Sequence, residues 1–272
     1  MNRLKDKIAI ITGASKGLGE ANTRLFVAEG AKVVITDIDK EAGEALAHEL
    51  GENVTFLYQD VRDEQGWITL IDNVVAQHGG LDVLVNNAGV VKPGTIESQT
   101  MDEYDFIMDV SARATFMGCK YAIPAMKASG SGSIINMASL ASIQGVSRVA
   151  AYSAAKGAVQ ALTINIAGYC GENQIDVRCN CLNPSSIDTP MVQNIRAQFM
   201  QNPEEAAKLA PKGEIGEPND VGHAVVFLAS DESKFINGVS IPVDYGKSIL
   251  PGLFKHPDQH LTSDLFNYQN YE

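Results

Sequence analysis

Short runs rich in β-branched residues alternate along this chain with longer segments of helical periodicity. The runs predict seven strands, at Lys7–Thr12, Lys32–Thr36, Val54–Tyr58, Leu81–Val85, Ser133–Met137, Asp176–Leu182 and Ser240–Val243. The periodic segments predict six helices, at Gly17–Glu29, Lys40–Leu50, Asp63–His78, Met101–Lys127, Ala150–Cys170 and Asn219–Ala229. Strands separated by helices need crossover connections, which make the strands parallel and cover both faces of the sheet. The order of segments therefore predicts an α/β fold, a Rossmann-type doubly wound parallel sheet in a single domain.

Length and charge limit the partners that this chain can have. Its 272 residues can bury one large core. They include 33 acidic and 21 basic side chains, a net charge of −12 that repels phosphate backbones, so we expect no nucleic-acid partner. No apolar run approaches the length of a membrane-spanning helix, and we expect no membrane partner.

The cysteines and histidines do not have the spacing of a metal site. The cysteines are Cys119, Cys170, Cys179 and Cys181. Because they contain no C-x-x-C pair, we expect reduced thiols in the core of a cytoplasmic protein. His256 and His260 have i,i+4 spacing, but Pro257 lies between them and no third ligand is evident nearby. We therefore predict exposed tail histidines and no metal.

The stretch Gly13-Ala14-Ser15-Lys16-Gly17-Leu18-Gly19 permits two interpretations. The first five residues match G-x-S-x-G, which presents a nucleophilic serine, here Ser15, in hydrolases. The three glycines also suit a loop that cradles a phosphate at the start of a helix. A hydrolase needs oxyanion donors from a loop after an earlier strand, and only twelve residues precede Gly13. The context of strand, loop and helix therefore favours a pyrophosphate-binding loop.

The second predicted strand ends next to Asp37, eighteen residues after Gly19. An acidic side chain at this position accepts hydrogen bonds from an adenosine ribose and repels a 2′-phosphate. Lys16 has the opposite effect, because a basic residue in the glycine loop can pair with that phosphate. Since Asp37 is aimed at the ribose hydroxyls, we predict NAD as the cofactor.

Tyr152 and Lys156 are one turn apart at the start of a predicted helix, on one face. A tyrosine with an ordinary pKa of about 10 is a poor acid–base catalyst at neutral pH. A cation about 5 Å away contributes about 3 kcal/mol at an effective dielectric constant near 20, enough to lower that pKa by about two units. The pair therefore suggests a tyrosine whose pKa a lysine lowers.

Taken together, these features and three others resemble the short-chain dehydrogenase/reductase family. The others are Asp60, the run Asn86-Asn87-Ala88-Gly89, and Ser139, which stands thirteen residues before Tyr152 as in the family. The resemblance extends from about Lys5 to Gly246. It implies an NAD(H)-dependent oxidoreductase that interconverts a secondary alcohol and a ketone, with a small molecule as substrate.

The resemblance also implies a role for each matching residue. Tyr152 would be the general acid–base, Ser139 would hydrogen-bond the reacting oxygen, and Lys156 would lower the tyrosine pKa and bind the nicotinamide ribose. Asp60 would accept a hydrogen bond from the adenine amino group, and Thr189 would hold the nicotinamide carboxamide. The implied cofactor-binding set is Gly13, Ser15, Lys16, Gly17, Leu18, Gly19, Asp37, Ile38, Asp60, Val61, Asn87, Ala88, Gly89, Tyr152, Lys156, Pro184, Ser185, Ile187 and Thr189.

Two positions depart from the family pattern. Ser111 follows Val110 where the family usually has an asparagine that holds a water in a proton relay, so the relay through Ser111 is expected to differ or to be slower. Ser185 follows Pro184 where the family favours glycine. If that position needs a positive φ, the serine costs about 1 kcal/mol or reshapes the loop.

The order of the predicted elements, together with the resemblance, divides the chain into regions. We expect residues 1–246 to form the NAD-binding catalytic domain, 185–216 its substrate loop, and 247–272 a C-terminal extension that packs on the protein or on a neighbouring subunit of a homotetramer. The residues expected near the substrate are Leu140, Ile143, Gln144, Val146, Arg148, Met191, Val192 and Ile195. Most are apolar, which suits a hydrophobic or cyclic, even steroid-like, substrate. The rival hypothesis is a non-catalytic dinucleotide-binding sensor or scaffold, although such proteins often lose the tyrosine or lysine retained here.

Overall fold

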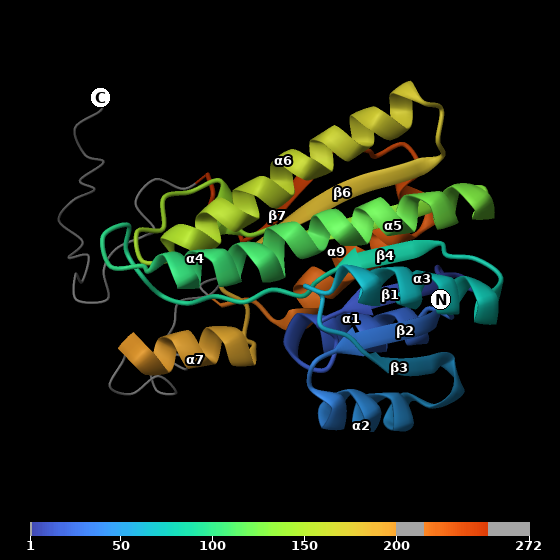
Figure 1. The fold of residues 1–272 in the computed structure, drawn as a ribbon, viewed down its shortest axis with the longest axis horizontal. Helices are drawn as coiled ribbons and strands as arrows, with labels where there is room; N and C mark the ends of the chain where they lie inside the picture. Colours follow the sequence, from blue (N-terminus) through green and yellow to red (C-terminus); the bar gives the residue numbers. More distant parts are fainter. Residues whose placement is uncertain (1, 200–214, 250–272) are drawn as a thin grey trace, which may run out of the picture.

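A computed structural model of the chain, which describes residues 2–199 and 215–249, contains one parallel sheet with the strand order β3-β2-β1-β4-β5-β6-β7 (Figure 1). The strands are β1 (Ile8–Thr12), β2 (Lys32–Asp37), β3 (Val54–Tyr58), β4 (Val83–Asn86), β5 (Gly132–Met137), β6 (Val177–Pro184) and β7 (Ser240–Val243). All neighbouring strands are parallel. The structure therefore confirms the predicted Rossmann-type sheet.

Helices cover both faces of this sheet. The helices are α1 (Gly17–Ala28), α2 (Lys40–Leu50), α3 (Glu64–His78), α4 (Met101–Met108), α5 (Ala114–Ser129), α6 (Ala150–Glu172), α7 (Pro190–Phe199) and α9 (Pro218–Ala229). Alternate strand residues point to opposite faces. Ile10 and Ile134 thus join a core cluster with α3, α5 and α6, whereas Ile11 and Ile135 join a second cluster with α1, α2 and α9. Both clusters are almost fully buried.

The predicted single helix Met101–Lys127 is interrupted in the structure. A π-helical segment, Asp109–Arg113, separates α4 from α5. Such π-bulges occur often at functional sites because the extra residue shifts the side chains that follow. This interruption contains Ser111.

The predicted substrate loop and tail are described only in part. Asp188 and Thr189 lead into α7, which Figure 1 shows outside the layers at one end of the molecule. Ile187 and Gly216 form an isolated parallel bridge at the base of the loop. The predicted tail beyond residue 249, with His256 and His260, lies outside the described residues.

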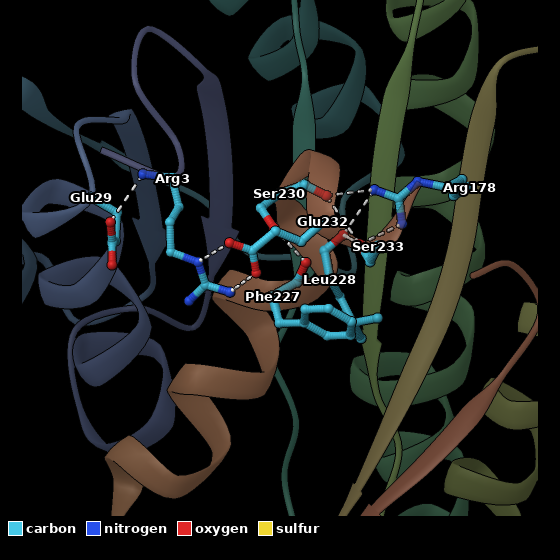
Figure 2. Close-up of polar contacts among 8 residues, drawn as sticks. All are labelled: Arg3, Glu29, Arg178, Phe227, Leu228, Ser230, Glu232 and Ser233. Atoms are coloured by element: carbon cyan, nitrogen blue, oxygen red, sulfur yellow. Dashed lines mark hydrogen bonds and ion pairs between the residues drawn. The ribbon is translucent and has the colours of Figure 1, made fainter. Parts of the chain in front are cut away.

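Arg178, the second residue of β6, fixes the C-terminal end of α9. Its guanidinium donates to the carbonyl oxygens of Leu228 and Ser230 at 3.0 and 3.3 Å and to Ser233 Oγ at 3.0 Å (Figure 2). The last carbonyls of a helix have no partner within the helix, and a cation is favourable at this end. Arg178 thus satisfies the helix end and joins it to the sheet.

The candidate site lies where the direction of winding reverses. Strand order runs outward from β1 to β3 on one side and from β4 to β7 on the other. At this switch point the loops after β1 and β4 leave the sheet in opposite directions, which opens a crevice at the carboxyl ends of the strands. The glycine loop follows β1, and Asn87-Ala88-Gly89 follows β4.

No helix in the described part of the chain has the length and apolar character needed to cross a bilayer. Within the same residues, no group of three or more His, Cys, Asp or Glu side chains is arranged to hold a metal ion. The four cysteines are free thiols and buried.

Candidate functional site

A cavity of about 350 Å³ occupies the crevice at the switch point. It brings together most of the predicted cofactor residues and three of the four predicted catalytic residues, all except Ser111. These lining residues are Gly13, Lys16, Gly17, Leu18, Asp37, Ile38, Asp60, Val61, Asn87, Ala88, Gly89, Ser139, Tyr152, Lys156, Pro184, Ser185, Ile187 and Thr189. Of the predicted substrate residues, Met191 and Val192 from α7 line it. Ser15, Gly19 and Ser111 do not appear among the described residues of its wall.

The glycine loop adopts a shape that only glycines allow at low cost. Gly13 and Gly17 have φ values of +61° and +60°, a region that side chains disfavour. A Cβ on Gly19 would lie 2.2 Å from the carbonyl oxygen of Gly13, so this position too has no room for a side chain. The loop therefore turns tightly into α1, with its backbone open to the cavity.

Asn87 and Thr12 hold this loop against the end of β4. Asn87 Nδ2 donates to the carbonyl oxygens of Thr12 and Gly13, each at 2.9 Å. Thr12 Oγ1 accepts from the backbone N–H groups of Asn87 and Ala88 at 3.1 Å. Sequence reasoning missed Thr12, although a polar residue that ends an otherwise apolar strand is a usable signal. Asn86 points elsewhere and donates to Asn136 Oδ1 inside the core.

Two loops meet at the end of β2 and fix the carboxylate of Asp37. Its Oδ2 accepts from the backbone N–H of Ser15 and its Oδ1 from that of Asp39, both at 3.0 Å. Ser15 Oγ donates to the carbonyl oxygen of Asp39 at 3.3 Å. Ser15 thus joins the two loops, which is a structural role and not that of a nucleophile.

Lys16 is engaged by an acidic residue that sequence reasoning did not single out. Its Nζ lies 2.6 Å from Asp39 Oδ2, and Asp39 also caps the N-terminus of α2 through Ala42. This contact raises the pKa of Lys16 and lowers that of Asp39, in both cases mainly through their mutual hydrogen bond. The signal in the sequence was a second aspartate two residues after Asp37.

Asp60 lines the cavity but has an ion-pair partner. Arg62 Nη2 lies 2.5 Å from Asp60 Oδ2, and Arg62 Nε donates to both carboxylate oxygens. This bidentate contact lowers the pKa of Asp60, mainly through the side-chain hydrogen bond. The carboxylate is therefore ionised and can accept further hydrogen bonds from the cavity side.

Tyr152 and Lys156 lie on one face of α6, as their spacing predicts. The Nζ atom of Lys156 is 5.6 Å from the centre of the Tyr152 ring. Lys156 is 4% exposed, and its Nζ donates to the carbonyl oxygen of Met137 at 2.7 Å. A Cβ on Gly89 would lie 3.1 Å from this Nζ, so the glycine after β4 leaves room for the ammonium.

Burial dominates the electrostatics of this pair. It lowers the pKa of Lys156 to about 8, because a desolvated ammonium is disfavoured. It also raises the pKa of Tyr152, while a hydrogen bond with Ser139 acts in the opposite direction. The net direction for Tyr152 differs from the lowering that the spacing suggested, because the sequence pattern does not report burial.

Ser139 begins a short turn at the end of β5, and Asn183 of β6 holds that turn in place. Ser139 Oγ accepts from the backbone N–H of Ala141 at 3.2 Å, and Asn183 Nδ2 donates to the carbonyl oxygen of Ser139 at 2.9 Å. Asn183 Nδ2 also donates to Ser142 Oγ at 2.6 Å, and Ser142 Oγ donates to Gln160 Oε1 of α6 at 2.9 Å. Sequence reasoning missed Asn183, a buried polar residue near the end of an apolar strand.

Ser111 lies behind Gly89, near Lys156. It is fully buried, and its Oγ has no hydrogen-bond partner among the described residues. A Cβ on Gly89 would lie 3.7 Å from Ser111 Oγ and 3.1 Å from Lys156 Nζ, so the two polar groups flank the same point. The serine hydroxyl is thus available to a group other than protein.

The second departure from the family pattern causes no backbone strain. Ser185 is not among the described residues with a positive φ, so its backbone does not need a glycine. Its N–H donates to the carbonyl oxygen of Val243 in β7 at 3.1 Å. Thr189, which is 7% exposed, lies just before α7 and accepts from the N–H of Val192 at 3.5 Å.

A second, shallower cavity of about 590 Å³ lies beside the first turn of α6. It contains two of the predicted substrate residues, Gln144 and Val146, together with Ser153. Gln144 Nε2 donates to the carbonyl oxygen of Lys247 at 2.9 Å, and its Oε1 is buried without a described partner. Leu140 is 5% exposed and lines neither cavity.

The donor set of the first cavity fits a nicotinamide dinucleotide. Glycines at the N-terminus of α1 leave backbone N–H groups for a pyrophosphate. Asp37 is fixed where a ribose would lie, and Asp60 is an ionised acceptor. Tyr152 and Lys156 line the same cavity.

Comparisons with known proteins agree with this architecture. A family model described as enoyl-(acyl carrier protein) reductase matches residues 13–248. The trans-4-hydroxycyclohexanecarboxylate dehydrogenase of Sinomonas cyclohexanicum is 37% identical over 91% of this chain and 95% of its own length. The NADP-dependent (R)-specific alcohol dehydrogenase of Lentilactobacillus kefiri is 39% identical over 90% and 98%.

A solved structure has the same fold as this chain. The crystal structure of levodione reductase superimposes with a TM-score of 0.84 at 32% identity, and covers 90% of this chain and 98% of the other. The relatives and the family model span almost the whole described chain, with the glycine loop and the Ser139, Tyr152 and Lys156 positions inside the match. The chain belongs to the short-chain dehydrogenase/reductase family.

Proposed function

We propose that the protein is an NAD(H)-dependent oxidoreductase that interconverts a secondary alcohol and a ketone on a hydrophobic or cyclic substrate. One observation carries the proposal: Ser139, Tyr152 and Lys156 meet in the cavity that also contains the glycine loop and Asp37. The relatives named above include dehydrogenases of a hydroxycyclohexane acid and of alcohols, which supports the reaction class.

Each residue has a defined task in this proposal. A bound oxidised nicotinamide would supply the hydride acceptor and a positive charge. Tyr152 takes the hydroxyl proton of the alcohol as the carbonyl forms, or gives a proton to the ketone oxygen in the reverse direction. Ser139, which hydrogen-bonds Tyr152, also holds the substrate oxygen. Lys156, anchored by Met137, places its charge beside the phenol ring.

The raised pKa of Tyr152 favours the direction that needs a proton donor at neutral pH. A phenol with a pKa above its usual value stays protonated, so it can protonate a ketone oxygen. Alcohol oxidation needs the phenolate, so its rate is expected to increase with pH. The positive charges of Lys156 and of the oxidised cofactor would favour that phenolate.

The wall of the cavity supports a hydrophobic substrate. Phe106 and Val110 line it from the α4 side, and Met191 and Val192 line it from α7. Apolar walls with a few convergent polar groups are typical of sites for small apolar ligands. A ring that bears a hydroxyl or keto group would suit this arrangement.

Support for NAD over NADP comes from Asp37. Its carboxylate is held by two backbone N–H groups and lies at the end of β2, where it would repel a 2′-phosphate. Because one relative is NADP-dependent, the proposed preference for NAD rests on the carboxylate of Asp37.

We further propose a homotetramer. Phe116 of α5 and Ile164 and Tyr169 of α6 are 53%, 56% and 50% exposed, and apolar side chains on neighbouring outer helices suit a contact between subunits. A tetramer in light scattering supports this; a monomer at micromolar concentration contradicts it. The predicted cytoplasmic location and the packing of the tail stay predictions.

A panel of secondary alcohols and ketones tests the function. It contains cyclohexanols, hydroxysteroids, diols, sugars and linear alcohols, each with NAD(H) and with NADP(H), followed by absorbance of the reduced cofactor. We expect turnover of cyclic alcohols with NAD. Tight NADH binding without turnover of any compound would favour the rival sensor or scaffold. Ester hydrolysis that depends on Ser15 would favour the hydrolase alternative.

A further inference from the structure

We propose that Asp39 is a specificity-determining residue that holds Lys16 in an ion pair and so prevents this lysine from binding a 2′-phosphate. The inference rests on the proposed use of NAD and deepens it. Lys16 and Asp37 give opposing signals for the two cofactors, because the first attracts a phosphate and the second repels it. Asp39 resolves this conflict in favour of NAD.

The ion pair draws the lysine head toward α2. Lys16 lines the cavity beside Asp37, whereas Asp39 is not among the described residues of that wall. The 2.6 Å contact between Lys16 Nζ and Asp39 Oδ2 therefore directs the ammonium toward the N-terminus of α2. A lysine held there has to leave its carboxylate before it can reach a phosphate in the cavity.

Hydrogen bonds of its backbone and side chain fix the position of Asp39. Its N–H donates to Asp37 Oδ1 at 3.0 Å and its carbonyl oxygen accepts from Ser15 Oγ at 3.3 Å. Its second carboxylate oxygen, Oδ1, accepts from the N–H of Ala42 at 3.1 Å as the cap of α2. One residue thus links the glycine loop, the ribose position and the helix, and its Oδ2 is left for Lys16.

The charges around Asp39 also disfavour binding of a 2′-phosphate. Lys40, the other cation at this end of α2, lies 3.7 Å from Glu44, and Glu41 in the first turn contributes to the raised pKa of Lys16. Both lysines therefore face carboxylates. A 2′-phosphate beside Asp37 would meet the carboxylates of Asp37 and Asp39, and the nearby Lys16 and Lys40 are already paired with carboxylates.

The test compares cofactor binding, not turnover, in the full-length protein. We would measure the dissociation constants of NADH and NADPH by calorimetry for the wild type, Asp39→Asn, Lys16→Met and the double variant. Asparagine is an equally good N-cap, so α2 should stay intact. Glu44→Gln is the matched control, because it frees Lys40 on the same helix and leaves Lys16 paired.

We expect Asp39→Asn to tighten NADPH binding about twofold to fivefold relative to NADH, because a freed lysine can pair with the phosphate and the exposed ion pair that held it is weak. The gain should vanish in the Lys16→Met background and should not appear in Glu44→Gln. An unchanged NADPH-to-NADH ratio in a correctly folded Asp39→Asn variant overturns the inference while the preference for NAD stands. An equal gain with and without Lys16 also overturns it.

The failure of the proposed function gives a different result. If the wild type binds NADPH as tightly as NADH, the proposed NAD preference is wrong, and the inference fails with it. Melting temperatures of all variants, measured without cofactor, show whether a loss of binding comes from unfolding.

Discussion

The Nζ atom of Lys156 lies 5.6 Å from the centre of the Tyr152 ring and donates to the carbonyl oxygen of Met137. Both side chains come from the first two turns of α6, and the helix places them on one face. The lysine is almost fully buried, so its ammonium group lies in a low-dielectric environment beside the phenol ring. This arrangement is the physical basis of the proposed chemistry.

Burial of Lys156 should appear in the pH dependence of stability. Its pKa is about 8 in the folded protein and about 10.4 in an unfolded chain, so between these values the unfolded state binds more protons. Above about pH 10.4 the lysine is neutral in both states and its burial costs nothing. As the pH falls from there through about 8 the buried lysine becomes charged, and the free energy of unfolding decreases. Relative to Lys156→Met, the wild type should gain about 2 kcal/mol in free energy of unfolding from pH 7 to pH 10.

Urea unfolding of both proteins at the two pH values measures this difference. The comparison cancels the other groups that titrate in this range, because both proteins carry them. An equal change with pH in the two proteins would show that the Lys156 ammonium is not desolvated.

Ser111→Ala should separate stability from proton transfer. The buried Ser111 Oγ has no described partner, so its removal should change the free energy of unfolding by less than about 1 kcal/mol. If Ser111 takes part in a relay from Lys156, turnover should fall and the solvent isotope effect should rise, with cofactor affinity unchanged.

Thr115→Val is the control for Ser111→Ala. Thr115 Oγ1 is also buried but donates to the carbonyl oxygen of Ser111 at 2.7 Å, so its loss should cost about 1 kcal/mol of stability. Turnover of Ser111→Ala at the wild-type rate, with the wild-type isotope effect, would exclude Ser111 from the relay.

Arg178→Met should destabilise the fold without touching the cavity. The variant removes the guanidinium from the last carbonyls of α9, and the loss of charged hydrogen bonds at a helix end should cost about 2–4 kcal/mol. Arg3→Met is the control, because the ion pair of Arg3 with Glu232 is more exposed and should contribute at most about 1 kcal/mol.

Thermal unfolding and NADH affinity are the two readouts for Arg178→Met. We expect a lower melting temperature with an unchanged dissociation constant for NADH, since Arg178 does not line the cavity. An equal loss of stability in the Arg3 and Arg178 variants would contradict the assigned role.

The sequence predicted those parts of the fold and site that depend on local pattern. The glycine loop, Asp37 and the spacing of Tyr152 and Lys156 are each read within a few residues, and the structure places them in one cavity. Asp39 was missed because its effect depends on a contact with Lys16, which lies on a different loop. Asn183 was missed for the same reason, since it supports Ser139 from a neighbouring strand.

Two further differences follow from packing. The periodicity of Met101–Lys127 does not reveal the π-helical segment Asp109–Arg113, because this segment is about one turn long within a much longer helical pattern. The direction of the Tyr152 pKa depends on desolvation, which a spacing of four residues cannot report. Local pattern thus identifies the residue types of the site, and tertiary structure determines their charges.

The most direct measurement is the turnover of Tyr152→Phe with a cyclic alcohol and NAD, beside its affinity for NADH. Tyr169→Phe, an exposed tyrosine on the same helix, is the control. If Tyr152 transfers the proton, Tyr152→Phe should lower turnover about 10²- to 10⁴-fold while the dissociation constant of NADH stays within about twofold. Turnover close to that of the wild type, in a variant that still binds NADH, would contradict the proposed mechanism.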